Sequence, residues 1–163
     1  MHVRHVIEVD IRPEYASRLD PLLLRSAVTE TLASRGLRAP RAISVTITDT
    51  RSVQRLNKRY LGDDSPTDVL SFNIDIAGLR RPDRVIDLGA LIIALPVAAR
   101  GARERGVDLA DEIALLLAHG TLHLLGFDHE TRPDDAQMRE LERTALRRLG
   151  RPQAARDPVP PLS

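Results

Sequence analysis

Three histidines within eleven residues carry the strongest chemical signal in this chain. His119, His123 and His129 lie in the segment LLLAHGTLHLLGFDHE, residues 115–130. Residues four apart on an α-helix lie almost above one another, so we expect His119 and His123 on one face. Gly126 suits the left-handed conformation that ends a helix, and the turn that follows can return His129 to the same face. Three imidazoles around an open fourth position form the arrangement of a catalytic zinc site.

The alternative is that these histidines are merely packed or solvated, as a single histidine on an apolar helix usually is. Here two are spaced at i and i+4, a third follows a helix-ending glycine, and the chain has no cysteine to act as a ligand. We therefore predict that His119, His123 and His129 bind one divalent metal ion. Zinc is favoured, although imidazole also accepts nickel, copper or iron.

The residue after the first histidine argues against a peptidase. Zinc peptidases with the H-E-x-x-H motif carry a glutamate base at that position, whereas this chain has Gly120. A glycine beside a ligand also lets another backbone or a substrate come close. A zinc hydrolase of peptide or small-molecule bonds therefore stays an alternative that lacks its usual base.

Two motifs resemble those of the YbeY family. The segment HGTLHLLGFDH, residues 119–129, resembles the family's H-G-x-L-H-L-x-G-[FY]-D-H. Residues 56–72 resemble a second family motif, L-N-x-x-[YW]-x-G-x-D-x-P-T-[DN]-V-L-S-F. Weaker similarity, reaching Met138 and Glu142, extends the resemblance over residues 40–145. The family consists of bacterial, metal-dependent endoribonucleases implicated in ribosomal RNA maturation and ribosome quality control.

The resemblance implies a single-strand endoribonuclease that acts on ribosomal RNA, with ribosomal or assembly proteins as further partners and no nucleotide cofactor. The main alternative is a metal-binding ribosome assembly factor that binds RNA but cleaves it little. Asp128 has two interpretations. It either orients a histidine N–H or transfers a proton, or it is a turn aspartate that bonds its own backbone. The resemblance favours a catalytic role for Asp128.

The chain departs from the family at positions that would contact phosphate. Many members carry an arginine and a lysine where this chain has Leu61 and Asp63, and residues 89–91 read Gly-Ala-Leu in place of G-D-[IV]. Lys58 and Arg59 lie one turn back and are candidate RNA-binding residues. The alternative is that both are solvated surface charges.

Composition limits the other possibilities. A chain of 163 residues with 42% hydrophobic and 29% charged residues fits one globular domain. Aromatic residues make up only 2%, which argues against an aromatic platform for base stacking. A net charge of +1 means that any RNA contact must come from a local patch. No apolar run approaches the ~20 residues of a membrane span and no signal pattern begins the chain, so we expect a cytoplasmic protein.

Hydrophobic periodicity predicts a single α+β domain with a mixed sheet of about four strands and about five helices. The metal site is expected at the C-terminal end of a central helix. The predicted strands are 3–9, 42–48, 67–76 and 85–94, and the predicted helices are 21–34, 50–60, 96–105, 108–125 and 133–149. Residues 1–150 would form the YbeY-like metallohydrolase domain. Four prolines after Gly150 favour a disordered tail over 151–163.

Overall fold

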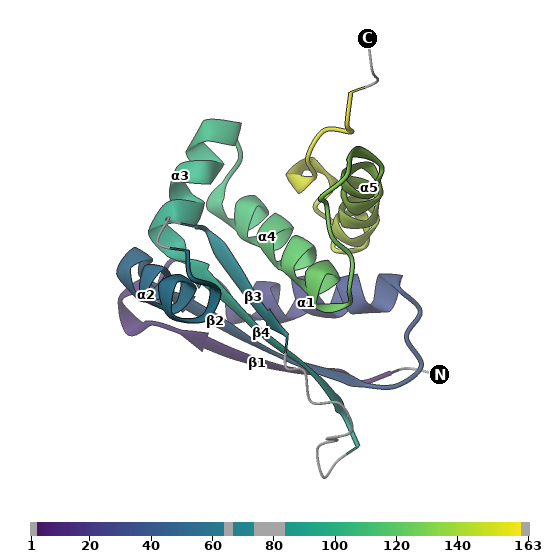
Figure 1. The fold of residues 1–163 in the computed structure, drawn as a ribbon, viewed down its shortest axis with the longest axis horizontal. Coiled ribbons are helices and arrows are strands. Elements are labelled where there is room, and N and C mark those ends of the chain that lie inside the picture. Colours follow the sequence, from purple (N-terminus) through teal and green to yellow (C-terminus); the bar gives the residue numbers. More distant parts are fainter. Residues whose placement is uncertain (1–2, 64–66, 74–83, 161–163) are drawn as a thin grey trace.

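The computed structural model describes residues 3–63, 67–73 and 84–160, which form one sheet and the helices around it (Figure 1). In chain order the elements are β1 (Val6–Ile11), η1 (Pro13–Tyr15), α1 (Pro21–Ser34), β2 (Arg41–Thr48), α2 (Thr50–Leu61), β3 (Val69–Asn73), β4 (Ile86–Ala94), α3 (Leu95–Arg105), α4 (Leu109–Leu124), α5 (Arg132–Arg148) and η2 (Pro152–Ala154). The predicted α+β class, with a mixed four-stranded sheet and five α-helices, is confirmed for the described residues.

The four strands lie in the order β1-β2-β4-β3. β1, β2 and β4 are parallel, and β3 runs antiparallel to β4 at the edge. The almost wholly apolar sequence of β4 matches its interior position. β1 begins at Val6, later than predicted, because its pairing with β2 starts at Val6 and Ala42. β3 ends at Asn73, and the predicted continuation to residue 76 lies outside the described residues.

Alternating side chains of β4 face two different layers. Leu91 and Ile93 are fully buried in the main core, against α1 and α4, which lie over one face of the sheet (Figure 1). Ala94 belongs to a smaller cluster with Val53 of α2 and Leu70 of β3. Because successive side chains of a strand point to opposite faces, α2 packs on the other side of the sheet from α4.

Aspartate caps begin three of the helices. Asp20, Asp49 and Asp108 accept backbone N–H groups in the first turns of α1, α2 and α4. Each cap satisfies one of the N–H groups that a helix start leaves without an intrahelical partner. Asp108 thereby fixes where the helix that carries the first two histidines begins. Within the described residues, no helix combines the length and the apolar character needed to cross a bilayer.

The chain after Gly150 differs from the predicted disordered tail. Residues 152–154 form η2, and Ala154 is fully buried against α4 and α5. Arg151 donates to Asp111 at 2.7 Å, and Arg156 donates to Glu142 at 2.9 Å. The expectation of disorder is therefore wrong for residues 151–157, because ion pairs to buried carboxylates hold a segment whose composition is poor in large apolar side chains.

Candidate metal centre

The three predicted histidines converge in the structure. His119 and His123 lie one turn apart near the end of α4, and Gly126, at φ +102°, reverses the chain after the helix. The Gly126 N–H donates to the carbonyl oxygen of His123 at 2.9 Å, which tightens this turn. His129 then returns to the same place. One ring nitrogen from each histidine lies within 4.8 Å of the others, and the ring centroids are 4.7–5.1 Å apart.

This arrangement fits a single metal ion. Two nitrogens on a tetrahedral zinc ion are separated by roughly 3.4 Å at ordinary bond lengths. Small rotations of the imidazole rings would therefore bring the three histidine nitrogens, now within 4.8 Å of one another, around one ion. His119 and His123 are half-buried and His129 is exposed. The exposed corner leaves room for a fourth ligand from solvent or substrate. The donor set, three imidazoles without a thiolate, suits zinc and the other borderline divalent ions.

A buried carboxylate orients the first histidine. Nδ1 of His119 lies 2.7 Å from Oε2 of Glu142, a residue of α5 with no exposed surface. Arg156 donates two hydrogen bonds to the same carboxylate, from Nε to Oε1 and from Nη2 to Oε2, each at 2.9 Å. An ionised carboxylate only accepts, so Nδ1 carries the proton and Nε2 of His119 is the nitrogen free to bind a metal.

The charges around Glu142 favour its ionised form. Burial alone would raise the pKa of Glu142, but hydrogen bonds from His119 and Arg156, together with the positive charge of Arg156, outweigh burial and lower the pKa. The carboxylate is therefore a permanent acceptor for the Nδ1–H of His119 at neutral pH.

The second histidine is held in its neutral form, which is the form that binds metals. Burial lowers the pKa of His123, and the neighbouring His119 and His129 lower it further. The charge of Asp128 and a backbone hydrogen bond with Phe127 act in the opposite direction without reversing the shift.

Gly120 lets α4 approach the sheet. A Cβ at this position would lie 2.7 Å from Cδ2 of Leu91 and 3.3 Å from Oγ of Ser71, and the first distance is too short for two carbon atoms. The close approach anticipated from the sequence is therefore made by sheet side chains. It brings the histidine face of α4 against the edge strand β3.

The histidines open into a cleft with a volume of about 440 Å³. Its wall is formed by β3, the residues just before it, and the end of α2. The non-histidine residues that line it are Leu61, Thr67, Asp68, Val69, Leu70, Ser71 and Asn73. Leu61, at the position where many family members carry arginine, is 59% exposed and puts an apolar side chain in this wall.

Asp128 is exposed, and its Oδ1 accepts the backbone N–H of Glu130 at 3.0 Å. This is the geometry of an aspartate that stabilises its own turn. Among the hydrogen bonds of the described residues, none joins Asp128 to a histidine. The carboxylate that orients a histidine of the candidate metal site is that of Glu142. Sequence reasoning placed Glu142 in the region of family resemblance but assigned it no role.

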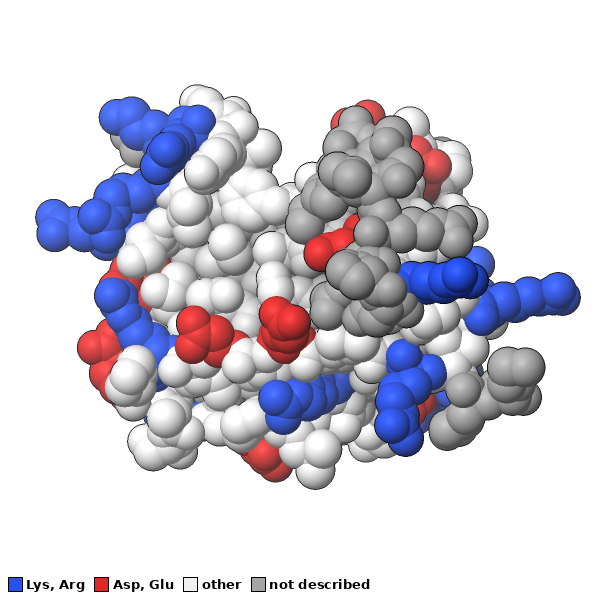
Figure 2. Space-filling model, turned by 90° about the horizontal axis from the view of Figure 1, so that it is seen from below, with Lys and Arg blue, Asp and Glu red and all other residues white. Residues whose placement is uncertain are grey.

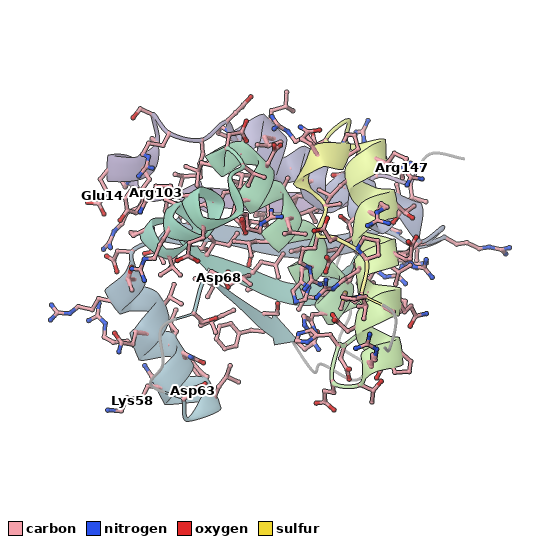
Figure 3. The ribbon with its side chains drawn as sticks, turned by 90° about the horizontal axis from the view of Figure 1, so that it is seen from above. Glu14, Lys58, Asp63, Asp68, Arg103 and Arg147 are labelled. Carbon is pink, nitrogen blue, oxygen red and sulfur yellow. The ribbon has the colours of Figure 1, made fainter. Side chains whose placement is uncertain are left out.

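Lys58 and Arg59 are exposed on the last turn of α2. Figure 3 shows Lys58 and Asp63 at the outer end of this helix, and Asp68 nearer the centre of the molecule. Neither Lys58 nor Arg59 lines the histidine cleft, and the guanidinium of Arg59 lies 5.3 Å from the Tyr60 ring centroid. On the face seen in Figure 2, basic side chains alternate with acidic and uncharged ones.

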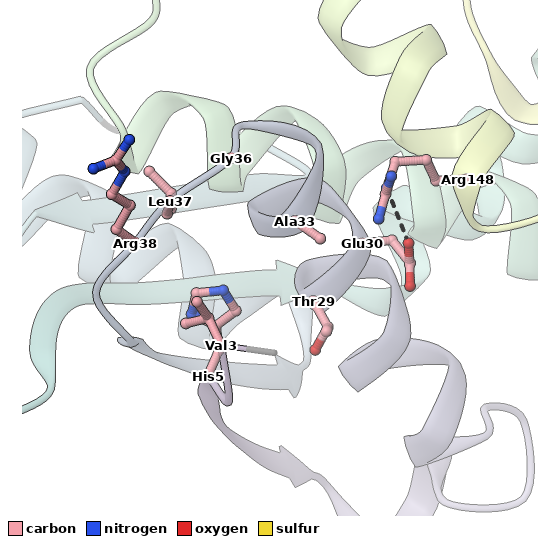
Figure 4. Close-up of a pocket in the computed structure, with 9 residues that line it drawn as sticks. All are labelled: Val3, His5, Thr29, Glu30, Ala33, Gly36, Leu37, Arg38 and Arg148. Atoms are coloured by element: carbon pink, nitrogen blue, oxygen red, sulfur yellow. Dashed lines mark hydrogen bonds and ion pairs between the residues drawn. The ribbon is translucent and has the colours of Figure 1, made fainter. Parts of the chain in front are cut away.

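A larger hollow, of about 600 Å³, lies at the N-terminal end of β1 (Figure 4). Its lining shares no residue with the histidine cleft. Three of the polar residues that line it have protein partners. Arg148 pairs with Glu30 at 3.1 Å, and Nδ1 of His5 accepts the Arg41 N–H at 2.9 Å. Size therefore does not single out a candidate site, whereas the convergence of three histidines does.

The fold and the cleft together define an α+β protein with a three-histidine site of the kind that holds a catalytic metal. Residues 14–150 match the family model described as Endoribonuclease YbeY. The chain therefore belongs to the YbeY endoribonuclease family. The match ends at Gly150 and does not include the C-terminal segment that packs against Glu142.

Individual relatives agree with this assignment. The chain is 42% identical to Endoribonuclease YbeY of Roseiflexus castenholzii over 148 residues, which is 89% of this chain and 93% of the relative. It is 44% identical to Endoribonuclease YbeY of Alkalilimnicola ehrlichii over 77% of this chain and 75% of that one. The solution structure of TM1509 from Thermotoga maritima shares the fold, with a TM-score of 0.58 and 23% identity over 88% of this chain and 89% of that chain.

Proposed function

We propose that this protein is a metal-dependent endoribonuclease that cuts single-stranded regions of ribosomal RNA during ribosome maturation and quality control. The observation that carries the proposal is the convergence of His119, His123 and His129 in an open cleft of a YbeY family member. We further propose zinc as the ion and the cytoplasm, where ribosomes are assembled, as the location. Ribosomal or assembly proteins are the expected further partners.

The residues of the cleft support distinct roles in this reaction. His119, His123 and His129 would hold the ion, which supplies Lewis acidity toward a phosphoryl oxygen and an acidified water at neutral pH. Glu142 fixes the tautomer of His119. The cleft runs beside the edge strand β3, between α2 and the histidines, and a flexible single strand can enter it more easily than a rigid duplex. Asp128 is the proposed proton-transfer group because its charge acts on His123.

Lys58 and Arg59 are the proposed RNA contacts on the α2 side. Both are exposed and lie within one turn of Leu61, which lines the cleft. Their charges would attract the phosphate backbone without specifying sequence.

A second candidate function is ribosome assembly with RNA binding but little cleavage. The exposed Leu61 favours it, because a leucine cannot neutralise a phosphate where many relatives place an arginine. A zinc peptidase finds no support in the cleft, since the position of the usual glutamate is Gly120, which is packed against Leu91 and Ser71.

The test is cleavage of purified ribosomal RNA by the metal-free and zinc-loaded protein, with His123→Ala and His5→Ala as variants. His5 serves as the matched control because it lies in the other hollow. We expect the loaded wild type and His5→Ala to cut the RNA, and a chelator or His123→Ala to reduce cutting to the level without protein. Cleavage that survives both treatments would refute the metal-dependent mechanism. RNA binding without cleavage would favour the assembly factor.

A further inference from the structure

The C-terminal segment, residues 151–157, lies beyond the family match yet is built into the support of the histidine site. Ala154 is fully buried with Ala114, Leu115 and Leu146. Arg105 donates to the carbonyl oxygen of Ala154 at 3.1 Å, and Arg151 lies 2.7 Å from the buried Asp111. These contacts fix the segment against both α4 and α5.

Two arginines of α5 hold the far end of the same segment. Arg143 donates to the carbonyl oxygen of Arg156 at 3.1 Å, and Arg139 donates to that of Asp157 at 2.8 Å. The backbone around Arg156 is therefore held on both sides. From this backbone the planar guanidinium of Arg156 donates to both oxygens of the Glu142 carboxylate.

We propose that Arg156 is a positioning residue for the metal centre, acting through Glu142 on His119, so that metal affinity depends on a segment outside the residues that match the family model. The inference rests on the proposed function in taking the three histidines as the metal site. Both Glu142 oxygens are hydrogen-bonded to Arg156, and Oε2 also faces His119. The carboxylate has no exposed surface, so water cannot replace the guanidinium without rearrangement.

Loss of Arg156 would leave the Glu142 carboxylate free to rotate, because each of its oxygens would lose a hydrogen-bond donor. A rotated carboxylate would release the His119 ring and weaken metal binding without removing a ligand.

The experiment measures zinc affinity by competition with a chromophoric chelator, on the full-length protein without RNA. The variants are Arg156→Gln, Glu142→Gln, the double variant and, as a matched control, Arg147→Gln. Arg147 is exposed on the last turn of α5, remote from the labelled residues of the cleft side (Figure 3). We expect a loss of about tenfold for Arg156→Gln and of about 10–100-fold for Glu142→Gln. Arg147→Gln should match the wild type.

The double variant separates positioning from general structural damage. If Arg156 acts through Glu142, adding Arg156→Gln to Glu142→Gln changes affinity no further. The visible absorption of the cobalt-loaded protein should shift in Arg156→Gln, because the orientation of one ligand changes. Arg156→Lys keeps the charge and loses the fork, so it should remain folded and show an intermediate affinity.

Wild-type affinity in a folded Arg156→Gln or Arg156→Lys, or full additivity in the double variant, would overturn the inference and leave the proposed function intact. A wild type that binds no zinc would overturn both.

Discussion

The α4–α5 side of the cleft and the last turn of α2, next to its opposite wall, hold their polar side chains in different ways. On the α4–α5 side, His119 is hydrogen-bonded to Glu142, which is completely buried and itself held by Arg156. On the α2 side, Lys58 and Arg59 are exposed. The hydrogen bonds on the first side, between α4 and α5, can fix the orientation of the His119 ring as closely as a metal site requires. The exposed charges on the second side, at the end of α2, can move to meet a substrate. We therefore propose that the first side carries the chemistry and that the second attracts the substrate.

The largest expected effect comes from removing one of the three histidines on the α4–α5 side. His129→Ala should weaken zinc binding by more than the roughly 10–100-fold that an outer-sphere partner typically costs. Lys58→Ala, on the α2 side, should leave zinc affinity unchanged because an exposed charge is screened by solvent. Chelator competition measures both. Equal losses of zinc affinity in the two variants would show that metal binding does not depend on the α4–α5 side alone.

The packing that brings α4 to the sheet can be tested with two glycines. Gly120→Ala should lower the free energy of unfolding by about 1–2 kcal/mol, since the clash with Leu91 exceeds the gain in helix propensity. Gly101→Ala, on α3, should raise it by up to about 1 kcal/mol, because a Cβ there meets only Glu112, at 3.7 Å or more. Urea denaturation of the metal-free proteins measures the difference. Stabilisation by both substitutions would show that α4 does not need this close approach.

Features of the site and the fold whose determinants are local could be predicted from the sequence. The i, i+4 spacing of His119 and His123 and the helix-ending Gly126 follow from the geometry of one helix and one turn, so the convergence could be predicted. The alternating and continuous apolar runs likewise predicted the strands. Their register and order depend on pairing between distant segments and were not available from periodicity.

The support of the site could not be predicted because its contacts are long-range. Glu142 is 23 residues from His119, and Arg156 is 14 residues from Glu142. Only the packing of α5 beside α4 brings them together. The prolines after Gly150 favoured a disordered tail by composition alone, and composition does not register ion pairs with buried carboxylates such as Asp111.

A smaller effect is expected on the α2 side. The double variant Lys58→Ala/Arg59→Ala should weaken single-stranded RNA binding by up to about tenfold and reduce the slope of log K against log salt by about 1.4, if each cation neutralises one phosphate. The control is Arg100→Ala/Arg103→Ala, which removes two exposed cations from α3. Fluorescence anisotropy at several salt concentrations measures the slopes. Identical slopes for the two double variants would remove α2 from the RNA contact.

The smallest expected effect is a pH dependence of the stability of the metal-free protein, which originates at His123 on the α4–α5 side. Because the pKa of His123 is lowered from 6.5 in the folded chain, the unfolded chain binds more protons and stability rises with pH. The contribution is complete above about pH 6.5 and is lost as the pH falls through the folded value. The thermal midpoint should therefore fall between pH 7.5 and pH 5.5 by more in the wild type than in His123→Gln.

A variant of Asp128 tests whether the pH dependence of stability originates at His123. Its charge opposes the lowering of the His123 pKa, so Asp128→Asn should lower that pKa further and steepen the loss of stability on acidification. An unchanged profile in Asp128→Asn would show that its carboxylate acts only on its own turn, where it accepts the Glu130 N–H. The proton-transfer role proposed for Asp128 predicts the steeper profile. A carboxylate close enough to exchange protons at this site also acts electrostatically on His123.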